Sequence, residues 1–141
     1  MISLMRNTDK THGACPILAE SEVQAFLIDG TAPESAQYLA VPTGKIVRRR
    51  GFWLTPSSRF HHGTSCFLIS TDVYAMNADE LENERQQVFC YSTQDLKTYY
   101  IGWIDDRDSV ADRILRPLID DLYPDLNVDQ LRYIGRVIAT T

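Results

Sequence analysis

The chain has 141 residues, of which 44% are hydrophobic, and carries a formal net charge of −5 at pH 7. This length predicts one globular domain over residues 1–141, in which residues 1–17 can be an extended or mobile segment. The sequence has no run of about 20 apolar residues, so it predicts no membrane span. The three cysteines, an odd number at wide spacing, favour a reducing, cytoplasmic setting over a disulfide framework.

The first predicted element is a short helix over residues 22–29. Ser21 and Gln24 have the spacing of a capping box, in which two side chains satisfy the free amide groups at a helix start. Gly30 is the residue type that best tolerates the left-handed conformation that follows many helices. A helix this short needs tertiary contacts to be stable.

Three strands are predicted next. Residues 38–41 and 46–54 flank a turn at residues 42–44, and residues 66–76 form the third strand, which is rich in β-branched and aromatic residues. A second helix follows, because Asn77 and Glu80 form another capping box. Its acidic residues at positions 79–84 would stabilise the helix start.

The second half of the chain predicts a hairpin and then two helices. Residues 88–91 and 98–104 form the hairpin. The apolar residues between Asp108 and Leu122 recur at helical spacing, with a kink at Pro117. The carboxylates at positions 105–108 would lie at the start of that helix. A capping box of Asn127 and Gln130 begins a last helix over residues 128–139.

These elements predict an α+β fold in a single domain. Their order is α-β-β-β-α-β-β-α-α, with a largely antiparallel sheet of about five strands packed with three or four helices. This order resembles that of type III secretion chaperones, which are also small, acidic and dimeric. The resemblance implies a non-catalytic accessory role.

The most informative feature is a window without acidic residues between Glu34 and Asp72. It holds five of the 14 Lys and Arg residues, including Lys45, and none of the 19 Asp and Glu residues. Arginine suits planar contacts with carboxylate or phosphate, and aromatic rings supply apolar anchors. The predicted partner-binding residues are Arg48, Arg49, Arg50, Phe52, Trp53, Arg59, His61 and His62.

Two functions compete for this basic window. A small binding protein of the inhibitor, chaperone or accessory-factor type would use it to dock a larger protein partner. The alternative is binding to a nucleic-acid backbone, which the acidic remainder of the chain disfavours. Charge segregation is also compatible with a homodimer. The structural alternative places the arginines on a sheet edge, or pairs one of them with an acid of the C-terminal helices.

Motifs for chemistry are incomplete, and we expect neither catalysis nor a cofactor. Gly44 and Lys45 lack the other residues of a phosphate-binding loop, so Gly44 is predicted to be a turn glycine. The sequence His62-Gly63-Thr64 resembles one of the two motifs of the 2H phosphoesterases, but no partner motif follows. His12 with Cys15 and His62 with Cys66 have spacings that zinc permits. A small phosphoesterase or a zinc-binding protein is therefore the second alternative.

Overall fold

The structure is a computed structural model that describes residues 13–47, 49–57, 59–60, 65–71, 87–105 and 113–141. These residues form one mixed sheet of nine strands in the order β2-β1-β3-β4-β9-β5-β6-β7-β8. The elements are β1 (Ala14–Leu18), α2 (Glu20–Asp29), β2 (Tyr38–Ala40), β3 (Arg50–Leu54), β4 (Phe67–Thr71), β5 (Phe89–Ser92), β6 (Tyr99–Asp105), β7 (Ile114–Pro117), β8 (Leu126–Asn127), the 3-10 turn η4 (Val128–Gln130) and β9 (Arg132–Thr140).

The predicted α+β fold with about five strands and three or four helices is wrong. Within the described ranges the sheet has nine strands, and α2 is the one α-helix. The resemblance to type III secretion chaperones rested on the predicted order of elements, and it is lost with that order. Within the same ranges, no helix is both long enough and apolar enough to span a membrane.

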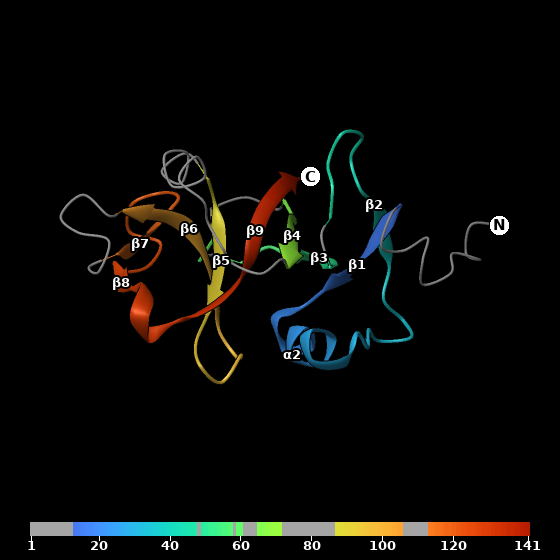
Figure 1. Ribbon diagram of the computed structural model, residues 1–141, viewed down its shortest axis with the longest axis horizontal. Coiled ribbons are helices and arrows are strands. Elements are labelled where there is room, and N and C mark those ends of the chain that lie inside the picture. The colour runs from blue at the N-terminus through green and yellow to red at the C-terminus, as the bar shows by residue number, and fades with distance from the viewer. Residues whose placement is uncertain (1–12, 48, 58, 61–64, 72–86, 106–112) are drawn as a thin grey trace.

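The last strand of the chain lies in the middle of the sheet, between β4 and β5 (Figure 1). The C-terminal half of β9 pairs antiparallel with β4, and its N-terminal half pairs antiparallel with β5. Arg136 belongs to both registers, opposite Ser70 on one side and Phe89 on the other. β9 therefore joins the strands that precede residue 72 to those that follow residue 86.

The first predicted helix is confirmed as α2, and its end is correct. Gly30 adopts the left-handed conformation, and its amide donates to the Phe26 carbonyl at 2.9 Å. The start lies earlier than predicted, because the helix begins at Glu20 rather than after Ser21. The cap comes from Glu22, whose carboxylate accepts the Ala19 amide at 2.7 Å. Residues 1–12 lie outside the described part, and Ala14–Leu18 form β1.

The predicted hairpin and turn are also confirmed. β5 and β6 pair antiparallel, with Cys90 opposite Ile101. At the turn before β3, the Lys45 amide donates to the Pro42 carbonyl at 3.1 Å, and Gly44 has a φ of +87°. Gly44 is thus a turn glycine, as predicted. The helix predicted from Asn77 lies outside the described residues.

The helix predicted between Asp108 and Leu122 is wrong where the structure describes it. Residues 114–117 form β7, which pairs antiparallel with β6 and β8. Pro117 ends β7, where the missing proline amide interrupts the sheet least. Beyond it the chain folds back, and the Tyr123 hydroxyl donates to the Ile101 carbonyl at 2.9 Å. Apolar residues at spacings of three and four had suggested a helix in a segment that is short and extended.

The predicted C-terminal helix over residues 128–139 is wrong for a different reason. Asn127 does act as a cap, because its side chain accepts the Asp129 amide at 2.9 Å, but the turn it caps is the short η4. The chain then continues as β9. Val137 packs against one core cluster and Ile138 against another. Because the strand has apolar side chains on both faces, its sequence lacks the alternation that marks a strand with one solvated face.

The core is divided between the two faces of the sheet. On β3, Phe52 and Leu54 belong to the largest apolar cluster with Val23 and Phe26 of α2. Trp53, which lies between them in sequence, packs in a second cluster with Leu68 and Cys15. This alternation follows from the period of two in a strand. A third cluster, built around Phe89, Tyr91, Ile104, Leu115 and Tyr123, lies toward β7 and β8.

Gly135 provides a test of the central position of β9. A Cβ atom at this position would lie 2.3 Å from the Ser70 carbonyl oxygen on β4. We expect Gly135→Ala to lower the free energy of unfolding by about 3 kcal/mol, at the upper end of the cost of overpacking, because the two strands would have to separate. Urea denaturation measures the change.

Gly44→Ala is the matched control for that substitution. No atom lies within 4 Å of a Cβ at Gly44, although its φ is +87°. Its cost should be only the backbone strain of a left-handed alanine, about 1 kcal/mol. Equal losses for the two variants would contradict the close approach of β9 to β4.

Candidate basic pocket

The aromatic residues of the predicted surface are core residues. Phe52 is 0% exposed and Trp53 is 1% exposed, and Phe60 is also buried. Trp53 donates its indole N–H to the Leu39 carbonyl at 3.1 Å, and Phe52 packs edge to face against Phe26. None of these rings lies on the surface to contact a partner. The interpretation of β3 as a sheet edge is wrong, because β3 lies between β1 and β4.

Arg50 has a structural role at the end of α2. Its Nη1 donates to the carbonyls of Phe26 and Leu27, each at 2.9 Å. These carbonyls lie in the last turn of the helix, where a cation is favoured by the helix dipole, and the Phe26 carbonyl also accepts the Gly30 amide. The guanidinium therefore ties the first residue of β3 to the last turn of α2.

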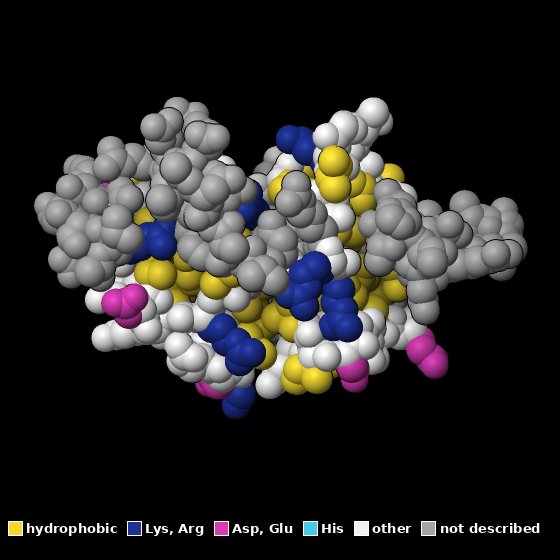
Figure 2. Space-filling view, viewed as in Figure 1, with side chains coloured by type: hydrophobic (Ala, Val, Ile, Leu, Met, Phe, Trp, Pro, Cys, Tyr) yellow, Lys and Arg dark blue, Asp and Glu magenta, His cyan; other side chains and the backbone are white. Residues whose placement is uncertain are grey.

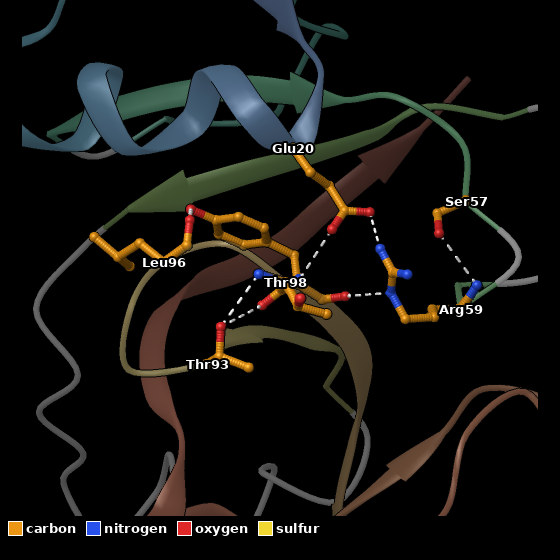
Figure 3. Close-up of polar contacts among 7 residues, drawn as sticks. Glu20, Ser57, Arg59, Thr93, Leu96 and Thr98 are labelled. Carbon is orange, nitrogen blue, oxygen red and sulfur yellow. Dashed lines mark hydrogen bonds and ion pairs between the residues drawn. The ribbon is translucent and has the colours of Figure 1, made fainter.

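Arg59 is also held within the protein (Figure 3). It pairs with the Glu20 carboxylate, and its Nε donates to the Tyr99 carbonyl at 3.2 Å. The other Glu20 oxygen accepts the Tyr99 amide at 3.1 Å. This arrangement connects the start of α2, the segment after β3 and the start of β6. The acid that pairs with an arginine of the basic window thus comes from α2, and not from C-terminal helices as the structural alternative supposed.

The remaining described arginine of the predicted set, Arg49, is exposed and has a φ of +59°. Consecutive residues of an extended strand point to opposite faces. The left-handed conformation at Arg49 breaks that alternation, and both Arg49 and Arg50 line the same pocket. A non-glycine residue in this conformation costs roughly 1–2 kcal/mol. Arg48, His61 and His62 lie outside the described residues.

The pocket has a volume of about 620 Å³, which is within the range of ligand pockets. It lies where the end of α2, the start of β3, the end of β4, the start of β9 and the β5–β6 turn meet. Among the residues that the structure describes, no acidic residue lines it. The lining residues are Leu27, Ile28, Arg49, Arg50, Thr71, Leu96, Arg132, Tyr133 and Ile134.

Two of the three arginines in this pocket are available to a ligand. In the described part of the chain, neither Arg49 nor Arg132 pairs with a carboxylate, and both are exposed. Arg50 already contacts carbonyls of α2. Figure 2 shows Lys and Arg side chains beside exposed hydrophobic ones on the lower centre of the molecule, where α2 and the lower part of β9 lie in Figure 1.

Asp29 is the acidic residue at the end of α2, and it is engaged elsewhere. Its carboxylate accepts the Thr31 amide at 2.9 Å. Hydrogen bonds from Thr31, and to a smaller extent the charge of Arg50, hold the pKa of Asp29 below its ordinary value. Asp29 is not among the pocket residues and does not pair with Arg49 or Arg132.

The cysteines considered as metal ligands are apolar core residues in this structure. Cys15 is 1% exposed, and Cys66 packs at the border of the same cluster. Burial raises the pKa of the Cys15 thiol to about 11, so it is protonated near neutral pH. Within the described residues, no group of His, Cys, Asp and Glu is arranged to hold a metal ion. His12 and His62 lie outside those residues.

Asp105 was predicted to stabilise a helix start, and this is wrong. It lies on β6 and is 4% exposed, and its carboxylate accepts a hydrogen bond from Nε of Arg116 at 2.5 Å. Arg116 also pairs with Asp125, and its guanidinium carbon lies 5.9 Å from the Trp103 ring centroid. This cluster stabilises the end of the sheet at β7.

The chain matches no protein-family model, and a search of the curated proteins finds no match. The functional argument therefore rests on the pocket itself. Sequence reasoning missed Arg132, because residues 128–139 were expected to be helical. The signal was present in the β-branched composition of residues 134–140, which favours a strand.

The roles of Arg50 and Arg49 can be separated by stability measurements. Arg50→Met keeps the aliphatic stem but removes the donors to Phe26 and Leu27. We expect it to lower the free energy of unfolding by about 2 kcal/mol, since hydrogen bonds from a charged donor contribute roughly 1.5–3 kcal/mol. Arg49→Met, measured in the same urea titration, should change stability by less than about 0.5 kcal/mol. Equal losses would assign Arg49 a structural role.

Thiol reactivity tests the placement of the cysteines. Burial raises the pKa of Cys15, Cys66 and Cys90, with the charge of Glu20 adding to the effect at Cys90. A raised pKa reduces the thiolate fraction, and buried thiols also exclude the reagent. Near neutral pH, we expect Ellman's reagent to label at most Cys66 in the folded protein, and all three thiols in urea. Rapid labelling of Cys15 or Cys90 without urea would contradict this placement.

Proposed function

We propose that this protein is a non-enzymatic binding protein that docks a larger protein partner through the basic pocket. The observation that carries the proposal is the presence of three arginines around one pocket, with no carboxylate among its described lining residues. Like charges held together repel one another, and an anionic group would relieve that repulsion. The role would be that of an inhibitor, a chaperone or an accessory factor. Three free cysteines support a reducing compartment such as the cytoplasm.

An acidic or carboxylate-bearing protein segment suits the site better than a nucleic-acid backbone. Backbone binding of useful affinity needs several phosphate contacts. The pocket offers two arginines, Arg49 and Arg132, that are not already used within the described chain. Two guanidinium groups match one carboxylate or a small acidic cluster.

The pocket also offers little for catalysis by its own side chains. Two of the described lining residues, Thr71 and Tyr133, carry a hydroxyl group. The Thr71 hydroxyl donates to the Arg50 carbonyl at 2.8 Å. Tyr133 packs its ring against Phe89 and Tyr91 in the core. These contacts favour a binding role for the site.

The proposal is tested by capture of partners from a lysate of the native host. The test variant is Arg49→Asn with Arg132→Gln, since asparagine tolerates the left-handed conformation and both changes replace a guanidinium by a neutral polar group. We expect captured proteins to be lost with this double variant, because the carboxylate-binding cations are gone, while nuclease treatment leaves capture unchanged. Mass spectrometry identifies and quantifies the captured proteins.

Lys45→Ala is the matched control. Lys45 is exposed and belongs to the same acid-free window, but it does not line the pocket. Capture by this variant should equal that of the wild type. Capture that survives the double variant would contradict docking at the pocket. Capture that is lost on nuclease treatment and falls steeply with salt would instead support a nucleic-acid partner.

A further inference from the structure

The basic pocket combines cationic and apolar walls. Leu27 and Ile28 come from the last turn of α2, Leu96 from the β5–β6 turn, and Ile134 from β9. Ile28 is one of the few large apolar side chains that are well exposed, at 68%. A ligand that fills this pocket must therefore place an apolar group and an anionic group close together.

The cations and the apolar wall are positioned by the same strand. Arg132 and Ile134 are two residues apart on β9, next to an irregularity in its pairing with β5, and both line the pocket. Ile134 is 6% exposed and belongs to the apolar cluster that also contains Leu96. Arg132 lies at the open end of this face and is exposed. The exposed Arg132 and the buried Ile134 therefore line one pocket.

We propose that the pocket binds the C-terminal residue of the partner, with its free carboxylate on Arg49 and Arg132 and an apolar side chain against Ile28, Leu96 and Ile134. This inference rests on the proposed function. It specifies which chemical group of the partner enters the pocket.

The compactness of the site favours a C-terminal residue over an internal acidic one. A C-terminal residue carries its carboxylate and its side chain on the same Cα, so one residue satisfies both walls. In an extended internal segment, adjacent side chains point in opposite directions, and an acidic and an apolar side chain on the same face are two residues, roughly 6–7 Å, apart. Arginine pairs, moreover, bind a planar carboxylate in a bidentate manner.

The test uses short fluorescein-labelled peptides and fluorescence anisotropy. The probe is Gly-Ser-Gly-Leu with a free C-terminal carboxylate, compared with the same peptide as its C-terminal amide. Two further peptides are Gly-Ser-Gly-Ser as the free acid and Gly-Asp-Gly-Leu as the amide, which carries its only carboxylate internally. We expect the free acid ending in leucine to bind at least about tenfold more tightly than each of the other three, because only it presents a carboxylate and an apolar side chain on a single residue.

Variants link this preference to the pocket. In the double variant Arg49→Asn with Arg132→Gln, the difference between acid and amide should disappear, while Lys45→Ala should retain it. Ile28→Ser, at an exposed position, should reduce the preference for leucine over serine and leave the preference for acid over amide intact. Circular dichroism of each variant confirms that it is folded.

Several results would overturn the inference. The inference is wrong if the acid and the amide bind equally, or if the internal aspartate peptide binds more tightly than the free acid. It is also wrong if inorganic phosphate displaces the probe at least as effectively as the free acid does, or if no peptide binds up to millimolar concentration. If lysate capture still depends on Arg49 and Arg132 in that case, the proposed function stands and only the C-terminal ligand is wrong. If capture is also insensitive to those arginines, both fail.

Discussion

The position of β9 is the constraint on which the rest of the structure depends. The strand comes last in the chain, yet it lies between β4 and β5 and pairs with both. In the described residues, β1 to β4 and β5 to β8 are linked through the sheet only by this strand. Its register must match two neighbours at once, and Gly135 allows the backbone of β4 to approach closely. Since these pairings join residues far apart in sequence, they cost loop-closure entropy before they contribute stability.

The basic pocket is a consequence of this arrangement. Ser70 of β4 pairs with Arg136, so the described part of β4 ends beside Gly135, while β9 begins at Arg132. The first residues of β9 therefore extend past the end of β4 and face the last turn of α2. Arg50 fastens that turn to the start of β3 through two carbonyls. Arg50, which holds the last turn of α2 on the sheet, thus also lines the pocket.

The sequence predicted the elements that neighbouring residues determine, and it failed for those that depend on contacts distant in sequence. Gly30, the turn at Gly44 and the β5–β6 hairpin are fixed by neighbouring residues, and all three were predicted. β9 and β7 were not, because a strand with apolar side chains on both faces resembles a helix in its hydrophobic spacing. For the site, the acid-free window contains Arg49 and Arg50, which line the pocket. The burial of Phe52 and Trp53 and the contribution of Arg132 depend on tertiary contacts that no local pattern reveals.

The three arginines of the pocket differ in what they can contribute to binding. Arg50 has exchanged its solvation for carbonyls of α2, so a ligand that recruited it fully would have to break those hydrogen bonds. Arg49 and Arg132 are exposed and bear no such cost. Arg49 nevertheless adopts a left-handed conformation that an arginine does not prefer, which places it beside Arg50 rather than on the opposite face. Unfavourable conformations are often retained where they position a functional group. Within the described part of the basic window, the chain thus accepts a local cost in stability at Arg49, whose side chain lines the pocket and makes no ion pair with a described residue.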